Sequence, residues 1–328
     1  MGNKDIVQLL LKHNADVNAQ GQKYGSALQA AASREDNKDI VQLLLEHNAD
    51  VNAKGGEYGT ALQAAASNGS QDVVQLLLKH QADVNAPGGD YIGSAIQEAA
   101  AHGHKDIVLL LLENNADVNA QDGKYGSPLQ AAAHNGYEEI VQLLLEHKAD
   151  VNVQGGDYGT VLYAAIIGGS MAIVQLLVER KADVNAQHAD HETALQSVAA
   201  WGNYDMCQLL LEHNADVNAQ GGEFGSALQA AVSWGNKDIV QLLLDHNADV
   251  NAPAGYHGSA VQAAASAGHK DIVQLLLGHK ADVNMQGGAF GSALQAATFW
   301  EYKDIVQLLL EHKADVNLQG EMMGVHFR

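Results

Sequence analysis

The sequence predicts an all-α solenoid, one elongated and curved domain in which short helix pairs stack along the chain. The tetrapeptide ADVN occurs ten times, and successive copies lie 33 or 34 residues apart. Each interval holds an alanine-rich and then a leucine-rich segment whose apolar residues have helical spacing. The length of 328 residues leaves open two globular domains or one array, and the repetition decides for the array.

The first helix of each unit is predicted to be thin. It follows a Ser or Thr whose hydroxyl can accept a hydrogen bond from a backbone N–H that the helix leaves unpaired. In the first copy its packing residues are Ala27, Leu28, Ala31 and Ala32, so small side chains dominate. The predicted N-caps are Ser26, Thr60, Ser94, Ser127, Thr160, Thr193, Ser226, Ser259 and Ser292.

The second helix is predicted to be thicker, with Ile40, Val41 and a run of leucines from Leu43 in the same copy. Thin helices beside thick ones are expected to curve the stack. Acidic residues begin this helix and histidines end it, which suits the helix dipole, so we interpret both sets as structural. They are Asp39, Asp72, Asp106, Asp238, Asp271 and Asp304, and His13, His47, His80, His147, His213, His246, His279 and His312.

A longer pattern joins these elements: [ST]-A-L-Q-x-A-A-x-x-G, then D-I-V-Q-L-L-L, then ADVN. It resembles the ankyrin repeat family from residue 1 to about residue 320. The resemblance gives a half repeat at 1–23, nine repeats over 24–319 and a short tail at 320–328. The segment YGSALQAAAS with LLLEH-type helix endings is most similar to arrays of filamentous fungi. That similarity implies the repeat region of a receptor-like protein.

The chain departs from the family pattern at two kinds of position. Glutamine replaces the family's usual histidine at Gln29, Gln63, Gln97, Gln130, Gln196, Gln229, Gln262 and Gln295. Asparagine or lysine replaces the glycine expected before Ala-Asp, where a left-handed residue ends the second helix. Asparagine tolerates that conformation, whereas Lys148, Lys181, Lys280 and Lys313 should each lose about 1 kcal/mol.

Composition excludes several classes of partner. The chain has 18 Lys and Arg against 39 Asp and Glu, a formal net charge of −21, so it repels nucleic acids and anionic membranes. We find neither a signal peptide nor a membrane-spanning run, and a single cysteine, Cys207, fits a cytoplasmic protein. No phosphate-binding loop or dinucleotide fingerprint is present, so no cofactor is expected. Cys207 is predicted to be a buried apolar residue.

The resemblance to ankyrin repeats implies that partners contact the hairpin tips and the last residues of the first helix. All three tryptophans fall in that helix-end register. Tryptophan often anchors interfaces, although packing beneath neighbouring loops is the alternative. The tip aromatics are interpreted mainly as stacking between tips. The predicted partner-binding residues are Arg34, Asn68, His102, His134, Tyr158, Tyr163, Ile167, Asp190, His191, Glu192, Trp201, Phe224, Trp234, Phe299 and Trp300.

Two polar groups allow a chemical alternative. The divergent tip QHADHET contains His188, Asp190, His191 and Glu192, but consecutive tip residues rarely converge on one ion, so no metal is expected. A second group joins Glu98, His102 and His104 to His134. We favour a polar rim there because no nucleophile accompanies it. If the protein is an enzyme, its acid–base groups are His102, His134, His188, Asp190, His191 and Glu192.

The sequence therefore predicts a non-catalytic scaffold that binds a protein or peptide in a concave groove. Acidic tip residues favour a basic partner by electrostatic steering. A small-molecule or enzymatic groove is the first alternative. The second is a self-associating array, since the chain starts on a second helix and stops at Met322–Arg328, just after a further hairpin begins. For these ends we favour a fragment of a longer protein over pairing with another chain.

Overall fold

The computed structural model describes residues 4–88, 92–188, 192–252 and 258–318. Within them the regular secondary structure is almost entirely helical, as predicted, and the residue contacts divide the chain into two compact units, Met1–Ala182 and Asp183–Arg328. The first unit contains α1 (Lys4–Lys12), α2 (Ala27–Ala32), the 3-10 turn η1 (Glu35–Asn37), α3 (Lys38–Glu46), α4 (Ala61–Ser67), α5 (Gln71–Lys79), α6 (Ala95–Ala101), α7 (Lys105–Glu113), α8 (Pro128–His134), α9 (Glu138–Glu146), α10 (Val161–Ile167) and α11 (Met171–Glu179).

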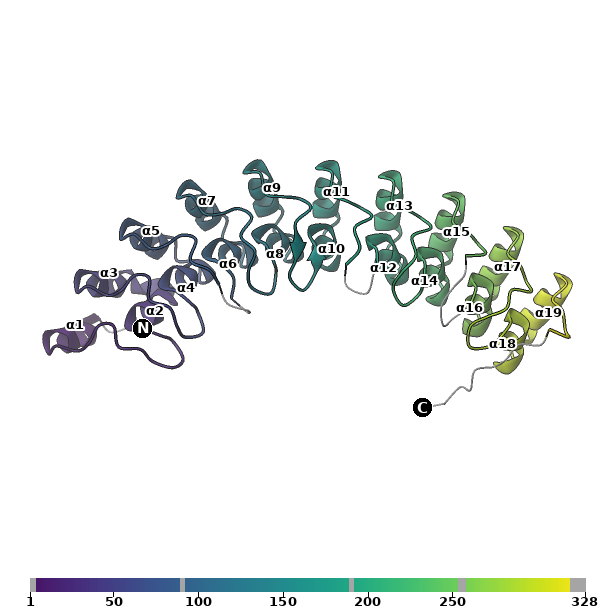
Figure 1. Ribbon diagram of the computed structural model, residues 1–328, viewed down its shortest axis with the longest axis horizontal. Coiled ribbons are helices and arrows are strands. Elements are labelled where there is room, and N and C mark those ends of the chain that lie inside the picture. The colour runs from purple at the N-terminus through teal and green to yellow at the C-terminus, as the bar shows by residue number, and fades with distance from the viewer. Residues whose placement is uncertain (1–3, 89–91, 189–191, 253–257, 319–328) are drawn as a thin grey trace. The chain divides into compact units, whose positions relative to one another are not determined.

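The second unit is built in the same way. It contains α12 (Ala194–Trp201), α13 (Tyr204–Glu212), α14 (Ala227–Ser233), α15 (Lys237–Asp245), α16 (Ala260–Ala267), α17 (Lys270–Gly278), α18 (Ala293–Phe299) and α19 (Lys303–Glu311). In each unit the first helices of the pairs form one row and the second helices another, with hairpins projecting beyond the first row (Figure 1). Among the described residues only β1 (Gln154–Gly155) and β2 (Gly159–Thr160) extend a hairpin into paired strands.

The core lies between the two rows and follows the predicted division of side chains. Ala64 and Ala65 of α4 and Val74 and Leu77 of α5 are fully buried. Alanine on the first helix lets neighbouring helices approach closely, while the larger side chains of the second helix fill the space between layers. Apolar burial in every pair therefore depends on the next pair, as expected of a repeat array.

The predicted helix ends are confirmed. All nine Ser and Thr residues stand at the N-caps, and the Thr60 hydroxyl accepts a hydrogen bond from the backbone N–H of Gln63 at 3.2 Å. At the other end of the pair the Nδ1 atom of His47 lies 2.9 Å from the carbonyl oxygen of Leu43. The following residue is left-handed, with φ of 61° at Asn48 and 67° at Lys148.

In seven repeats a buried glutamine joins the helix pair to the hairpin of the next pair. In α6 the Oε1 atom of Gln97 accepts a hydrogen bond from the N–H of Ser94 at 2.8 Å. Its Nε2 atom donates to the carbonyl oxygens of Asp122 at 2.8 Å and Gly126 at 2.9 Å, in the following hairpin. The glutamine that replaces the family's usual histidine therefore links one repeat to the next. The glutamines whose Nε2 makes this link are Gln29, Gln63, Gln97, Gln130, Gln196, Gln229 and Gln262.

The ADVN segments form a second line of links between repeats. The backbone N–H of Asp50 donates to Oδ1 of Asn18 at 2.7 Å, and Nδ2 of Asn18 donates to the carbonyl oxygen of Asn48 at 3.3 Å. Within the same segment, Oδ1 of Asp50 accepts from the N–H of Asn52 at 3.0 Å. Aspartate therefore shapes its own turn, and asparagine reaches the next copy, which explains why these two residues recur together.

One full repeat has no glutamine at this position. Tyr163 takes its place in α10, and Thr160 caps that helix by accepting from the N–H of Tyr163 at 3.1 Å. A phenol cannot supply the two amide hydrogens with which Gln97 reaches the next hairpin. This repeat is the last one of the first unit.

Replacing Gln97 with Leu should lower the free energy of unfolding by about 2–3 kcal/mol. Leucine keeps most of the side-chain volume but leaves the Ser94 N–H and two hairpin carbonyls without their protein partner. Urea unfolding followed by circular dichroism measures this loss. Gln208, whose Nε2 bonds to Glu212 on the exposed face of α13, is the matched control. Equal loss of stability in Gln97→Leu and Gln208→Ala would contradict the link.

Candidate interaction surface

The residue eight positions after each N-cap ends the first helix and differs in character between the two units. In the first unit the residues at this position are Arg34, Asn68, His102, Asn135 and Gly168. In the second unit they are Trp201, Trp234, Ala267 and Trp300, which we call the indole row. The N-caps that position them are all formed, so the shared register of the row is structural and not merely a spacing in the sequence.

The tryptophans of the indole row lie on the surface. Trp201 is 53% exposed, Trp234 is 64% exposed and Trp300 is 44% exposed. Trp201 and Trp234 therefore each present more than half of their surface to solvent. Trp300 has ring contacts, with Phe299 edge-on at 5.2 Å and Phe290 at 6.4 Å between centroids. Phe299 is itself 37% exposed, so this cluster widens the row at its α18 end.

The tip aromatics stack where neighbouring tips are both described. Tyr24 lies over Tyr58 with 6.4 Å between ring centroids, and Tyr125 lies over Tyr158 at 6.2 Å. Stacking between tips is thus confirmed for these two pairs. Offset stacking of this kind is worth about 1 kcal/mol beyond the buried area, which is enough to hold adjacent hairpins in register.

The structure places His134 against a tyrosine of the tips. His134 stacks on Tyr158 at 4.2 Å, and the Tyr158 hydroxyl lies 3.0 Å from its Nε2 atom. Burial by the tyrosines, and then the charge of nearby Lys124, lower the pKa of His134. The His134 ring therefore takes part in the stack formed by the tip tyrosines Tyr125 and Tyr158. The sequence spacing did not indicate this contact.

The other members of the predicted polar group, Glu98, His102 and His104, make contacts near the end of α6. The Nδ1 atom of His102 lies 2.9 Å from the carbonyl oxygen of Glu98 and 3.9 Å from its carboxylate. The Glu98 carboxylate accepts from the N–H of Gly93 at 2.9 Å, and the His102 ring stacks on His104 at 6.2 Å. The Glu98 carboxylate lies beside the His102 ring, but both side chains bond to the backbone: His102 at the end of α6 and Glu98 in the hairpin before it.

The divergent tip pairs its own residues. The N–H of His188 donates to the carbonyl oxygen of Glu192 at 3.1 Å, and their side chains approach to 3.8 Å between Nε2 and Oε2. Asp190 and His191 lie outside the described residues. In the part of the chain that is described, no three His, Cys, Asp or Glu side chains form a group suited to a metal ion.

The other predicted contact residues are spread over separate helix ends. Arg34 is exposed before η1, and Asn68 donates through Nδ2 to the Ser70 hydroxyl at 3.5 Å. Ile167 is 38% exposed at the end of α10. Tyr163 and Phe224 are half-buried. Arg34 and Asn68 share the helix-end position of the indole row, but only the second unit carries tryptophan there.

Family membership follows from a comparison with known proteins. The model of the family described as ankyrin repeats matches residues 1–88, 55–122, 96–188, 129–221, 162–254 and 228–320. The chain is an ankyrin repeat protein. No curated protein matches it. The family assignment accounts for the helix pairs and hairpins, and ankyrin repeats generally serve protein–protein interaction.

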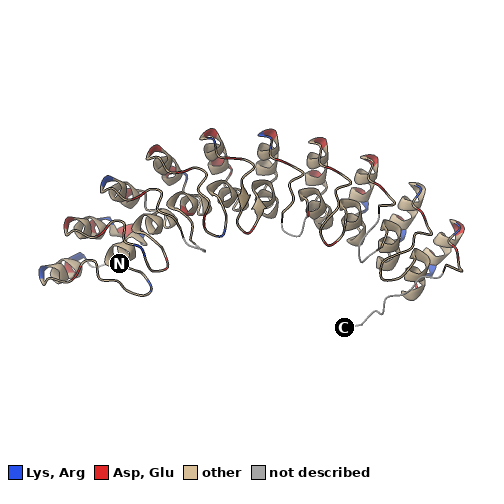
Figure 2. Cartoon of the chain, in the orientation of Figure 1, with Lys and Arg blue, Asp and Glu red and all other residues tan. Residues whose placement is uncertain are grey.

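Charge in this ankyrin protein avoids the first helices. Figure 2 shows acidic and basic residues mainly on the second helices and on the loops, with the first helices nearly free of both. Glu98 is the one Asp, Glu, Lys or Arg residue within the described first helices. No described helix has the length and apolar character needed to cross a membrane. The first-helix ends therefore offer a surface on which aromatic contacts are not surrounded by charged helix positions.

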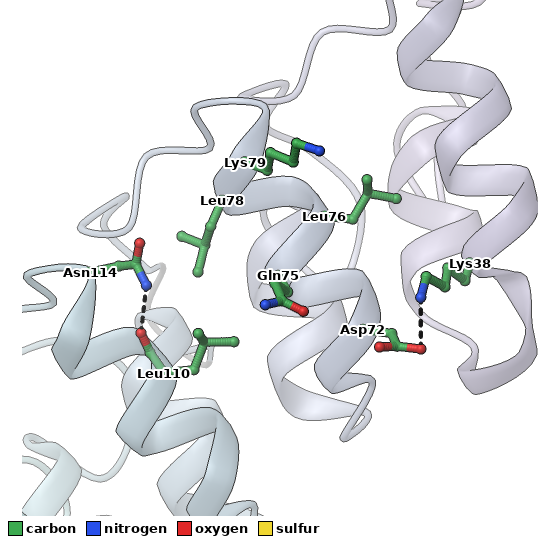
Figure 3. Close-up of a pocket in the computed structure, with 8 residues that line it drawn as sticks. All are labelled: Lys38, Asp72, Gln75, Leu76, Leu78, Lys79, Leu110 and Asn114. Carbon is green, nitrogen blue, oxygen red and sulfur yellow. Dashed lines mark hydrogen bonds and ion pairs between the residues drawn. The ribbon is translucent and has the colours of Figure 1, made fainter.

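The ankyrin repeats also leave a hollow of about 500 Å³ among the second helices, and it has no catalytic arrangement. Lys38 Nζ lies 2.9 Å from an Asp72 carboxylate oxygen in this hollow, and Asn114 donates to the carbonyl oxygen of Leu110 at 2.8 Å (Figure 3). The lining residues are Lys38, Asp72, Gln75, Leu76, Leu78, Lys79, Leu110 and Asn114. None of the predicted site residues belongs to this lining.

Cys207 is fully buried in α13, which confirms the prediction of a core thiol. Burial raises its pKa to about 12. The thiolate is the reactive form, so a thiol in this setting is neither a nucleophile nor a metal ligand near neutral pH.

The Cys207 thiol should resist alkylation by iodoacetamide in the folded ankyrin protein and react readily in urea. Burial excludes the reagent and suppresses the thiolate. Mass spectrometry of the intact chain counts the adducts. Labelling of the native chain at the rate of a free thiol would contradict its burial in the core.

His134 should titrate below the ordinary histidine value of 6.5. Because the folded pKa is the lower one, the unfolded chain binds more protons as the pH falls through 6.5. The His134 contribution to the free energy of unfolding should therefore decline on acidification. Nuclear magnetic resonance of the ring protons measures the pKa, and Lys124→Gln should raise it part of the way. Titration of His134 above 6.5 would contradict the arrangement.

Proposed function

We propose that this ankyrin array is a non-catalytic recognition scaffold that binds a protein or peptide across the ends of its first helices. The observation that carries the proposal is the exposure of Trp201, Trp234 and Trp300 in one register of the second unit. Large exposed aromatics are costly to hydrate, and tryptophan is among the residues that most often dominate binding energy.

Charge supports a basic partner. The chain carries a net charge of −21, and the tips beside the indole row include Glu192 and Glu223. Such charges act mainly by speeding the encounter with a basic segment and by repelling acidic competitors. The aromatic side chains would then supply most of the affinity after contact.

The wider setting rests on the sequence resemblance alone. A cytoplasmic location and a place as the repeat region of a fungal receptor-like protein are part of the proposal. An enzymatic groove gains no support from the described histidines, because His102 and His134 are each committed to neighbouring groups.

Panning of a displayed random-peptide library against the 328-residue chain tests the proposal. Peptides enriched by the unchanged protein should lose at least tenfold in affinity with Trp234→Ala, since a central aromatic anchor contributes about 2 kcal/mol or more. Leu109→Ala is the control because Leu109 is 37% exposed on α7, a second helix, and is not part of the indole row. Enrichment that is indifferent to Trp234→Ala, or no enrichment at all, would reject the proposal.

A further inference from the structure

We propose that the indole row recognises a proline-rich segment in the polyproline II conformation, with prolines three residues apart. This inference rests on the proposed function and names the chemistry of the partner. The inference is based on the match between the spacing of the indole row and the pitch of a polyproline II helix. Two further features support it: Ala267 interrupts the row, and the Glu301 carboxylate stands at its end.

The spacing of the row is set by helix packing. α12 packs against α14, α14 against α16, and α16 against α18, side by side in the second unit (Figure 1). Packed helices lie about 9 Å apart. A polyproline II helix advances about 9.3 Å per turn of three residues. Every third residue of such a ligand therefore meets the end of the next first helix.

Aromatic rings suit this conformation for a further reason. Proline-rich helices dock on exposed aromatic side chains, and they lose little conformational entropy on binding because they are already extended. A β-strand would place same-face side chains about 6.7 Å apart, which falls out of step with the row after one repeat. The row from Trp201 to Trp300 spans three helix spacings, or roughly 27 Å, which nine polyproline II residues cover.

The row has one gap, at the end of α16. Ala267 stands where the neighbouring helices carry Trp234 and Trp300, and the left-handed Gly268 follows it with φ of 78°. The short side chain leaves room for a larger ligand residue at that step. The ligand pattern along the row is thus proline, proline, a bulky apolar residue and proline, each three residues after the last.

A carboxylate marks the end of the row. Glu301 is exposed and follows Trp300 directly with φ of 60°, a left-handed conformation that glycine adopts at the same position in seven other repeats. A glutamate in that conformation is strained by about 1 kcal/mol relative to glycine. Its presence beside an exposed indole favours a ligand with a basic residue next to its last proline.

The test uses two fluorescein-labelled peptides, PKAPKAFKAPR and its reverse-order counterpart RPAKFAKPAKP, because either chain direction satisfies the row. Fluorescence anisotropy with the full chain measures their affinities. A peptide of the same composition in which no two of the prolines and the phenylalanine are three residues apart, PPKAKFPAKAR, is the control ligand. We expect at least one spaced peptide to bind at least tenfold more tightly than the control.

Variants of the protein locate the contact. Trp234→Ala should weaken the spaced peptide at least tenfold and Leu109→Ala less than twofold. Ala267→Trp should weaken the phenylalanine-containing peptide and strengthen a version with proline in place of phenylalanine. Circular dichroism and urea unfolding confirm that each variant is folded.

Equal binding of spaced and control peptides, or binding that is unchanged by Trp234→Ala, would overturn the inference. So would the absence of binding by both spaced peptides. If library peptides without proline spacing still depend on Trp234, the proposed recognition function stands and the polyproline II ligand is wrong. If no library peptide depends on Trp234, both are wrong.

Discussion

A buried primary amide joins seven of the helix pairs to the hairpin that follows them, and the regularity of the array depends on that bond. Gln97 shows the arrangement: its oxygen completes the N-cap of its own helix, and its nitrogen reaches two carbonyls of the next hairpin. An amide is suited to this position because it offers an acceptor and two donors on one short side chain. Losing it would leave several buried backbone groups without partners.

The N-caps explain where the surface residues stand. Because the Thr or Ser hydroxyl of the N-cap accepts a hydrogen bond from a backbone N–H in each of these helices, the helix end lies at a constant distance along the chain from it. Trp201, Trp234 and Trp300 each follow their N-cap by eight residues and are exposed. Residues at this position contribute little to the core, so their side chains can vary without disturbing the stack. The buried positions of a repeat therefore stabilise the stack, and the exposed helix-end position is available for binding.

The sequence predicted the features that depend on local chemistry. Helix pairs, Ser and Thr N-caps, histidine helix ends, left-handed lysines and the buried Cys207 all follow from short-range patterns, and the structure has them. The role of Gln97 was missed because its partners lie 25 and 29 residues away, in a hairpin whose backbone geometry the sequence did not define. The contact of His134 with Tyr158 was missed for a similar reason, since Tyr158 lies 24 residues further on.

The surface could be predicted only in part. The register of the tryptophans is visible in the sequence, but their exposure depends on how neighbouring hairpins fold over the helix ends. Glu301 is visible in the sequence as a departure from the repeat, because it replaces the glycine that follows the first helix in seven other repeats. Its backbone conformation in the structure, with φ of 60°, shows why glycine is the usual residue there.

Hydroxyl-radical footprinting of the chain with and without a selected peptide tests the central claim most directly. The account predicts that oxidation of Trp201, Trp234 and Trp300 falls together on binding, while Tyr137, an exposed aromatic 36% accessible in the first unit, is unchanged. Protection of Tyr137 with all three tryptophans still oxidised at the free rate would contradict the account.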